Sequence, residues 1–197
     1  MKQKHSELFL YILCAIFAAL TGVLSQVQVP LPFTPVPINL ALLSVLICGG
    51  VLGAKKGAIA MVVYILLGAV GVPMFSGFTG GIGILTGPTG GYIIGYLPAA
   101  VIMGLMAQWA PKTGSAAVKT GKGIAASLAK GVPAVAACYA LGTIWFMIST
   151  GTGFAESLLM CVIPFIPGDV LKIIAASVVC EALRRPMKGF AFRGAIH

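Results

Sequence analysis

Charged residues are scarce in this 197-residue chain. Asp and Glu number four and Lys and Arg thirteen, so charged residues make up 9% of the sequence, against roughly 25% in soluble domains. Hydrophobic residues make up 59%, and the mean hydropathy is +1.05. This composition excludes an ordinary soluble protein and predicts that the lipid bilayer surrounds the chain. The length leaves room for a single transmembrane substrate-binding domain, residues 1–197.

Residue patterns for catalysis and metal binding are also missing from the sequence. The two histidines lie near or at the termini, at positions 5 and 197, and the five cysteines stand singly in apolar segments. No His-Glu-x-x-His, Gly-x-Ser-x-Gly or phosphate-loop lysine motif is present. We therefore expect no enzymatic activity, no bound metal or cofactor, no nucleic-acid partner and no ATP hydrolysis by this chain itself.

Six apolar segments predict an all-α integral membrane protein with six transmembrane helices. The segments are residues 8–27, 38–54, 57–72, 91–110, 124–148 and 158–183. A spanning helix needs about 17 to 25 apolar residues, so the second and third segments are short. The alternative is that these two form one broken span, interrupted at glycines. Those glycines are Gly49, Gly50, Gly53 and Gly57.

The basic residues gather in alternate connections between the predicted helices. Twelve of the thirteen lie in or near these connections or at the termini: Lys2, Lys4, Lys55, Lys56, Lys112, Lys119, Lys122, Lys130, Arg184, Arg185, Lys188 and Arg193. The other connections, residues 28–37, 73–90 and 149–157, contain no Lys or Arg. Because basic loops stay in the cytoplasm, this asymmetry predicts a multi-pass protein with both termini cytoplasmic.

The thirteenth basic residue, Lys172, and an acidic residue, Asp169, lie deep inside the last apolar segment. They are three positions apart, so they share one face of a helix. Counted back from Arg184, they lie roughly 18 and 22 Å from the cytoplasmic boundary, in the outer half of a core about 30 Å thick. Pro167-Gly168 suggests a newly started helical turn, whose dipole would help to keep Asp169 ionised. A charge at this depth indicates a binding site; the alternative is a structural pair that locks the helix.

Two of the predicted outer connections differ from ordinary loops. Residues 28–37 contain four prolines, which predict a stiff and extended segment. Residues 73–91 are rich in glycine, which lets the backbone approach a ligand closely. Both could be flexible exterior loops. Their place on the same side as Asp169 and Lys172 favours a lid over a binding site.

Three motifs in order resemble the BioY family, the biotin-specific S components of energy-coupling-factor (ECF) transporters. They are Pro-Val-Pro-Ile at 35–38, Gly-Pro-Thr-Gly-Gly-Tyr at 87–92 and Gly-Asp-Val-Leu-Lys at 168–172. The resemblance covers essentially the whole chain and implies the six-helix S-component fold in a prokaryotic cell membrane. It also implies high-affinity biotin capture on the outer side and uptake as the substrate-specific subunit. The implied partners are a coupling transmembrane subunit of the EcfT type and two ATPase subunits, which alone use ATP.

The main alternative is a self-sufficient secondary transporter of a small anionic solute, with Asp169 as a proton or sodium relay. Transporters of that class often carry inverted repeats, and the two halves of this sequence show no convincing one. The chain also offers only one acid deep inside an apolar segment.

The resemblance assigns the Gly-Asp-x-x-Lys acid and lysine to Asp169 and Lys172, and the tyrosine after Gly-Gly to Tyr92. The chain differs from some relatives at Thr79, where they have asparagine, and at Ile93, where they have arginine. The full set of predicted substrate-binding residues is Asp169, Lys172, Tyr92, Thr79, Gly91 and Phe78.

Biotin has a ureido ring with two N–H donors, an apolar thioether ring and an anionic valerate tail. A carboxylate such as Asp169 can accept a charge-assisted bond from a ureido N–H, and Lys172 can meet either the valerate or the ureido oxygen. Aromatic side chains at Tyr92, Tyr96, Phe75 and Phe78 are expected to form the apolar wall.

Small residues form a stripe on the first predicted helix, at Ala15, Ala18, Ala19 and Gly22. Small residues let membrane helices approach closely. The resemblance implies docking on the coupling subunit through an Ala-x-x-x-Ala face, which predicts Ala15, Ala19 and Gly22 as docking residues. The alternative is internal packing against another helix of the same chain.

Overall fold

The computed structural model describes residues 2–109 and 121–187, and most of these are helical. The elements in chain order are α1 (Lys2–Gln26), β1 (Gln28–Leu31), β2 (Thr34–Asn39), α2 (Ala41–Ala69), α3 (Ile82–Thr86), α4 (Gly90–Trp109), α5 (Gly121–Thr150), α6 (Phe154–Cys161), the short 3-10 turn η2 (Ile163–Phe165) and α7 (Ile166–Met187). The basic residues Lys112, Lys119, Lys188 and Arg193 lie outside the described residues.

Five helical stretches of the described chain are long and apolar enough to cross a membrane. They are Glu7–Gln26, Ala41–Ala69, Gly90–Gln108, Gly123–Thr150 and Phe154–Leu183. The predicted all-α membrane fold is therefore confirmed. The stretches cover all six predicted segments, because two of those segments are the two arms of α2.

A sharp break divides α2 at Gly53, whose φ of 78° and ψ of 176° are not helical. A methyl group placed on Gly57 would lie 3.2 Å from the Cα of Gly49, whereas residues eight apart in a straight helix are separated by about 12 Å along the axis. The arms at 41–52 and 54–69 are thus separate helical segments, and the chain bends so sharply at Gly53 that Gly57 lies against Gly49. They correspond to the second and third predicted helices. The structure thus has two helical segments, as one alternative predicted, and they are joined directly at a glycine, as the other predicted.

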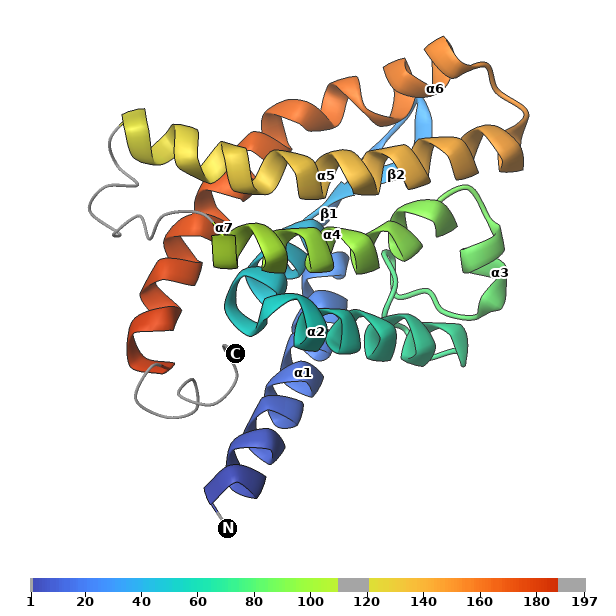
Figure 1. Cartoon of the computed structure of the whole chain (residues 1–197). Coiled ribbons are helices and arrows are strands. Elements are labelled where there is room, and N and C mark those ends of the chain that lie inside the picture. The colour runs from blue at the N-terminus through green and yellow to red at the C-terminus, as the bar shows by residue number, and fades with distance from the viewer. Residues whose placement is uncertain (1, 110–120, 188–197) are drawn as a thin grey trace.

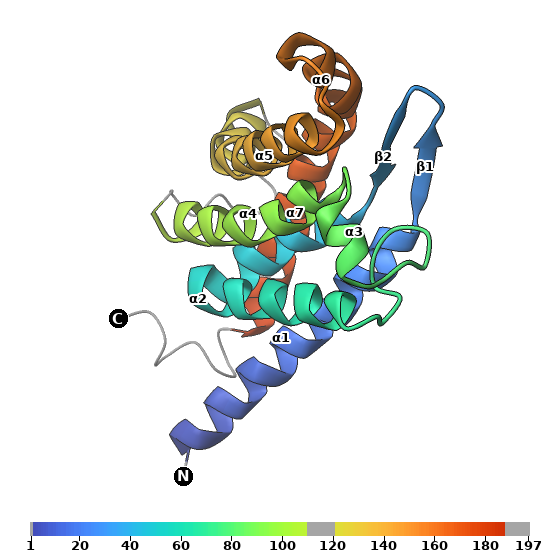
Figure 2. The same ribbon diagram turned by 90° about the vertical axis from the view of Figure 1, so that its right-hand side faces the viewer.

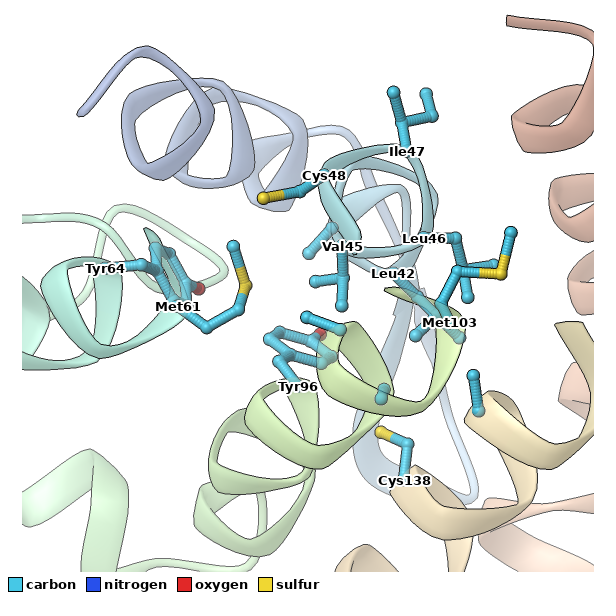
Figure 3. Close-up of a cluster of buried hydrophobic side chains, with 14 of the residues drawn as sticks. Leu42, Val45, Leu46, Ile47, Cys48, Met61, Tyr64, Tyr96, Met103 and Cys138 are labelled. Atoms are coloured by element: carbon cyan, nitrogen blue, oxygen red, sulfur yellow. The ribbon is translucent and has the colours of Figure 1, made fainter. Parts of the chain in front are cut away.

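The core lies around α2, which packs against α1, α4 and α7. Figure 3 shows Val45 from the first arm of α2 facing Met61 and Tyr64 from the second arm and Tyr96 from α4. All four side chains are buried. The apolar face of each helix is therefore covered by its neighbours in this region, and the many exposed apolar side chains elsewhere suit contact with lipid.

The helix ends and their connections gather at two opposite ends of the molecule. Figure 1 shows α3, α6 and the loop after α2 at one end of the molecule, and the end of α4, the start of α5 and the end of α7 at the opposite end. The bend of α2, which carries Lys55 and Lys56, lies against α4 at Gly104, where a methyl group would lie 2.3 Å from the nitrogen of Ala54. The bend thus belongs to the second of these ends.

The proline-rich connection is a β-hairpin and not an isolated extended loop. β1 pairs with β2 in antiparallel register, with Gln28 opposite Asn39 and Leu31 opposite Thr34. Proline has no N–H to donate, but it is tolerated where a strand edge is unpaired, and a two-stranded ribbon has such an edge on each strand. Seen from the end that carries α3 and α6, the hairpin stands at one side of the helices (Figure 2).

The last predicted helix, residues 158–183, is broken in the structure. α6 ends at Cys161, and η2 with Pro164 separates it from α7. Because α7 begins at Ile166, Asp169 lies in its first turn, as the Pro167-Gly168 pair predicted. The break thus places the acidic residue at a helix N-terminus, where the dipole favours negative charge.

Candidate ligand-binding site

A cavity of about 380 Å³ lies at the end of the molecule that holds the hairpin and the glycine-rich loop. The hairpin, α2, the glycine-rich loop, α4, α5, η2 and α7 all contribute to its wall. The lining residues are Gln28, Pro30, Leu31, Thr34, Pro35, Val36, Pro37, Asn39, Leu42, Tyr64, Phe75, Ser76, Thr79, Ile84, Thr89, Tyr92, Ile93, Tyr96, Cys138, Tyr139, Phe165, Asp169 and Lys172. Both unusual connections therefore meet the charged face of α7.

The two charged side chains of the cavity are buried and form a hydrogen-bonded network with a partly buried tyrosine. Asp169 and Lys172 are 3% and 7% exposed, and Lys172 Nζ donates to Asp169 Oδ1 at 2.7 Å. The hydroxyl of Tyr139, on α5, donates to Asp169 Oδ2. A carboxylate has about four lone-pair sites and an ammonium has three donors. Asp169 therefore keeps acceptor sites, and Lys172 keeps donors, for a ligand.

Aromatic rings form much of the apolar wall. The rings of Tyr64 and Phe75 meet edge to face with centroids 5.7 Å apart, and Tyr64 lies 6.2 Å from Tyr96. The hydroxyl of Tyr92 is within hydrogen-bond distance of Thr143, which lies outside the lining. Tyr92 thus contributes to the cavity wall, and its hydroxyl has a polar partner on α5. Ile93 also lines the cavity.

The hairpin and the glycine-rich loop are joined by a polar contact at the cavity edge. Asn39 Nδ2 donates to Ser76 Oγ at 2.7 Å, and Thr79 Oγ1 donates to the carbonyl oxygen of Ser76 at 3.0 Å. On its other side, the hairpin reaches α6, where Thr34 Oγ1 and Cys161 Sγ lie 3.5 Å apart. The hairpin is therefore held between the loop and α6, which gives the cavity its roof.

Two residues predicted to bind substrate lie outside the cavity lining. Phe78 is 73% exposed and points away, whereas Phe75 in the same loop lines the wall. Gly91 packs on α5, where a methyl group would lie 2.2 Å from Cβ of Trp145. The close approach that its glycine permits is therefore between helices.

Several lining residues were not predicted, and Tyr139 and Asn39 are the most informative. A buried tyrosine in an apolar helix usually has a polar partner, which was a signal for Tyr139, but the sequence does not name Asp169 as that partner. Asn39 is the last residue of β2, and no sequence motif marks it as a binding residue. Within residues 2–109 and 121–187, no group of three His, Cys, Asp or Glu side chains could hold a metal ion.

The small-residue stripe on α1 is divided between two environments. Ala15 and Ala19 are exposed, whereas Ala18 and Gly22 are buried. A methyl group on Gly22 would lie 2.9 Å from Sδ of Met74, in the glycine-rich loop. The expectation that Gly22 forms part of an outer docking face is therefore wrong, because this glycine packs inside the molecule.

Comparisons with known proteins agree on one family. The family model described as the BioY family matches residues 1–189. The chain is 36% identical over 184 residues to a probable biotin transporter BioY of Pyrococcus horikoshii, with 93% of this chain and 98% of that one covered. It is 34% identical over 174 residues to a biotin transporter BioY of Rhizobium etli, with 87% and 91% covered.

The fold has a counterpart among solved structures. It is similar to the crystal structure of the S-component for biotin from an ECF-type ABC transporter, with a TM-score of 0.80 and 26% sequence identity. The match covers 94% of this chain and 95% of that chain.

Proposed function

The chain belongs to the BioY family, and we propose that it captures biotin as the S component of an ECF-type transporter. The observation that carries this proposal is the buried Asp169–Lys172 pair on the wall of an otherwise largely apolar cavity. A concave apolar site with a few placed polar groups is the usual form of a small-ligand site.

The chemistry of biotin matches the cavity wall. The ureido N–H groups can donate to the remaining lone pairs of Asp169 in charge-assisted bonds. The thioether ring can lie against the aromatic wall formed by Tyr92, Tyr96 and Phe75. The ammonium of Lys172 meets either the valerate or the ureido oxygen, and Thr79 adds a hydroxyl to the cavity wall.

Energy for uptake comes from partners in this proposal. The sequence has no phosphate-loop lysine motif, so a coupling transmembrane subunit and two ATPase subunits are needed. Exposed Ala15 and Ala19 on α1 are the proposed docking residues. The chain then acts as one transmembrane substrate-binding domain and catalyses no reaction.

The proposed orientation in the cell membrane has both termini in the cytoplasm. The bend of α2 is basic, and Lys56 Nζ lies 2.7 Å from Glu7 Oε2 near the start of α1. The cavity lies at the opposite end, among connections without Lys or Arg. The positive-inside rule therefore supports a cavity that faces outward.

Reconstituted uptake tests the function. Proteoliposomes that contain the chain, the coupling subunit, both ATPase subunits and internal ATP are expected to accumulate labelled biotin over many turnovers. Liposomes with the chain alone are expected to retain no more biotin than one molecule per protein. Continuous uptake by the chain alone, abolished by an ionophore that collapses the ion gradient, would instead establish a secondary transporter.

A further inference from the structure

The last residue of α1, Gln26, is held by the glycine-rich loop although it does not line the cavity. Its Nε2 donates to the carbonyl oxygen of Phe75 at 3.0 Å, and its Oε1 accepts from the backbone N–H of Phe78 at 2.7 Å. The neighbouring Ser25 Oγ donates to the carbonyl oxygen of Met74 at 2.7 Å. One side chain thus bonds to both sides of the turn at residues 75–79.

That turn has an unusual backbone. The N–H of Phe75 donates to the carbonyl oxygen of Thr79 at 2.9 Å, and the N–H of Thr79 donates back at 3.3 Å. Between them, Gly77 and Phe78 have φ values of 75° and 55°. A bulky residue rarely adopts a positive φ. The bond from the Phe78 N–H to Gln26 stabilises this conformation from outside the turn.

The two ends of the turn form part of the ligand cavity. Phe75 and Thr79 both line it, while Phe78 points away. If the turn relaxed, the aromatic ring at one end and the hydroxyl at the other would both shift relative to Asp169. The position of this wall therefore depends on a residue that makes no contact with the cavity.

We propose that Gln26 is a positioning residue for biotin binding, which fixes the 75–79 turn so that Phe75 and Thr79 face the ligand. This inference rests on the proposed function, since biotin is the ligand used to test it. The hydrogen-bond partners of the Gln26 side chain are backbone groups and the hydroxyl of Ser25. None of these partners titrates, which allows a pH test.

The test compares biotin affinities of the purified full chain and two variants at about pH 7 and about pH 4. Gln26→Met keeps the length but loses both hydrogen bonds to the 75–79 turn, and its Kd is expected to rise roughly 5- to 20-fold at both pH values. Gln26→Glu introduces a carboxylate, which cannot donate to the Phe75 carbonyl while it is ionised. An ordinary glutamate has a pKa of about 4.3, so its carboxyl group is mostly neutral at about pH 4. Its Kd is therefore expected to return toward the unmodified value at the lower pH.

Each variant is compared with the unmodified chain at the same pH, so that titration of the biotin carboxylate cancels. An unchanged Kd for Gln26→Met would overturn the proposal. Equal weakening of Gln26→Glu at both pH values would also overturn it, because a general loss of structure does not recover on protonation. If the unmodified chain binds no biotin at either pH, the proposed function fails, and this inference fails with it.

Discussion

Replacing Asp169 with asparagine is expected to weaken biotin binding by roughly 10- to 150-fold and to leave the protein folded. The change keeps the shape of the side chain but removes the charged acceptor, and hydrogen bonds to charged groups contribute about 1.5 to 3 kcal/mol. It also leaves the buried ammonium of Lys172 without its carboxylate, 2.7 Å away. Calorimetric titration of the purified variant measures the Kd.

The matched control for this change is Glu156→Gln. Glu156 lies in the first turn of α6, is exposed and does not line the cavity. It undergoes the same chemical change, so its Kd is expected to equal that of the unmodified chain. Equal affinities for Asp169→Asn and Glu156→Gln would remove Asp169 from the proposed site.

Lys172→Met then distinguishes the two orientations of biotin. If the ammonium meets the valerate, the variant loses more affinity for biotin than for a biotin amide, because the amide lacks the anion. If the ammonium meets the ureido oxygen, the two ligands lose equally. Retention of full affinity for both ligands would contradict a role for Lys172 in binding.

Replacing Ala15 and Ala19 together with tryptophan is expected to abolish partner-dependent uptake and to leave biotin binding by the isolated chain unchanged. Both alanines are exposed on α1, and small residues permit the close helix contact that docking requires. Two indole rings would hold the helices apart. The measurement is uptake in proteoliposomes with the coupling and ATPase subunits, alongside titration of the isolated variant.

The chain supplies a matched control on another helix. Ala136 and Ala140 on α5 are also exposed and also four residues apart. Tryptophan at these two positions adds the same bulk to a lipid-facing surface and is expected to leave uptake near the unmodified level. If the α5 pair blocks uptake and the α1 pair does not, docking belongs to α5. If the α1 pair abolishes biotin binding as well, the stripe serves internal packing.

The features that the sequence predicted depend on local spacing and on charge. Helical spacing placed Asp169 and Lys172 on one face, and their ion pair in the structure fits that prediction. The Pro167-Gly168 pair predicted a helix start close to Asp169, and α7 begins at Ile166. Six apolar segments were also recognisable, because apolar length is a property of the sequence itself.

The features that were missed depend on contacts between distant segments. Strand pairing in residues 28–39 was not predicted, because four prolines argue against a strand unless its edge is unpaired. The choice of Phe75 over Phe78 as the lining ring follows from a turn that Gln26 holds from α1. Tyr139 reaches Asp169 only because α5 packs on α7. Likewise, Gly22 was assigned to an outer face because its contact with Met74 comes from a loop some fifty residues away.

Protection of a cysteine at position 79 by biotin tests the central claim, that biotin occupies this outward-facing cavity. The five native cysteines are buried, so the unmodified chain serves as the background. In intact cells, an impermeant thiol reagent is expected to label Thr79→Cys, on the cavity wall, and Phe154→Cys, exposed at the start of α6, but not Lys55→Cys at the bend of α2. Saturating biotin is expected to slow labelling at position 79 alone. The site would be contradicted if biotin did not slow labelling at position 79, or slowed labelling at positions 79 and 154 equally. Labelling of position 55 from outside would contradict the proposed orientation.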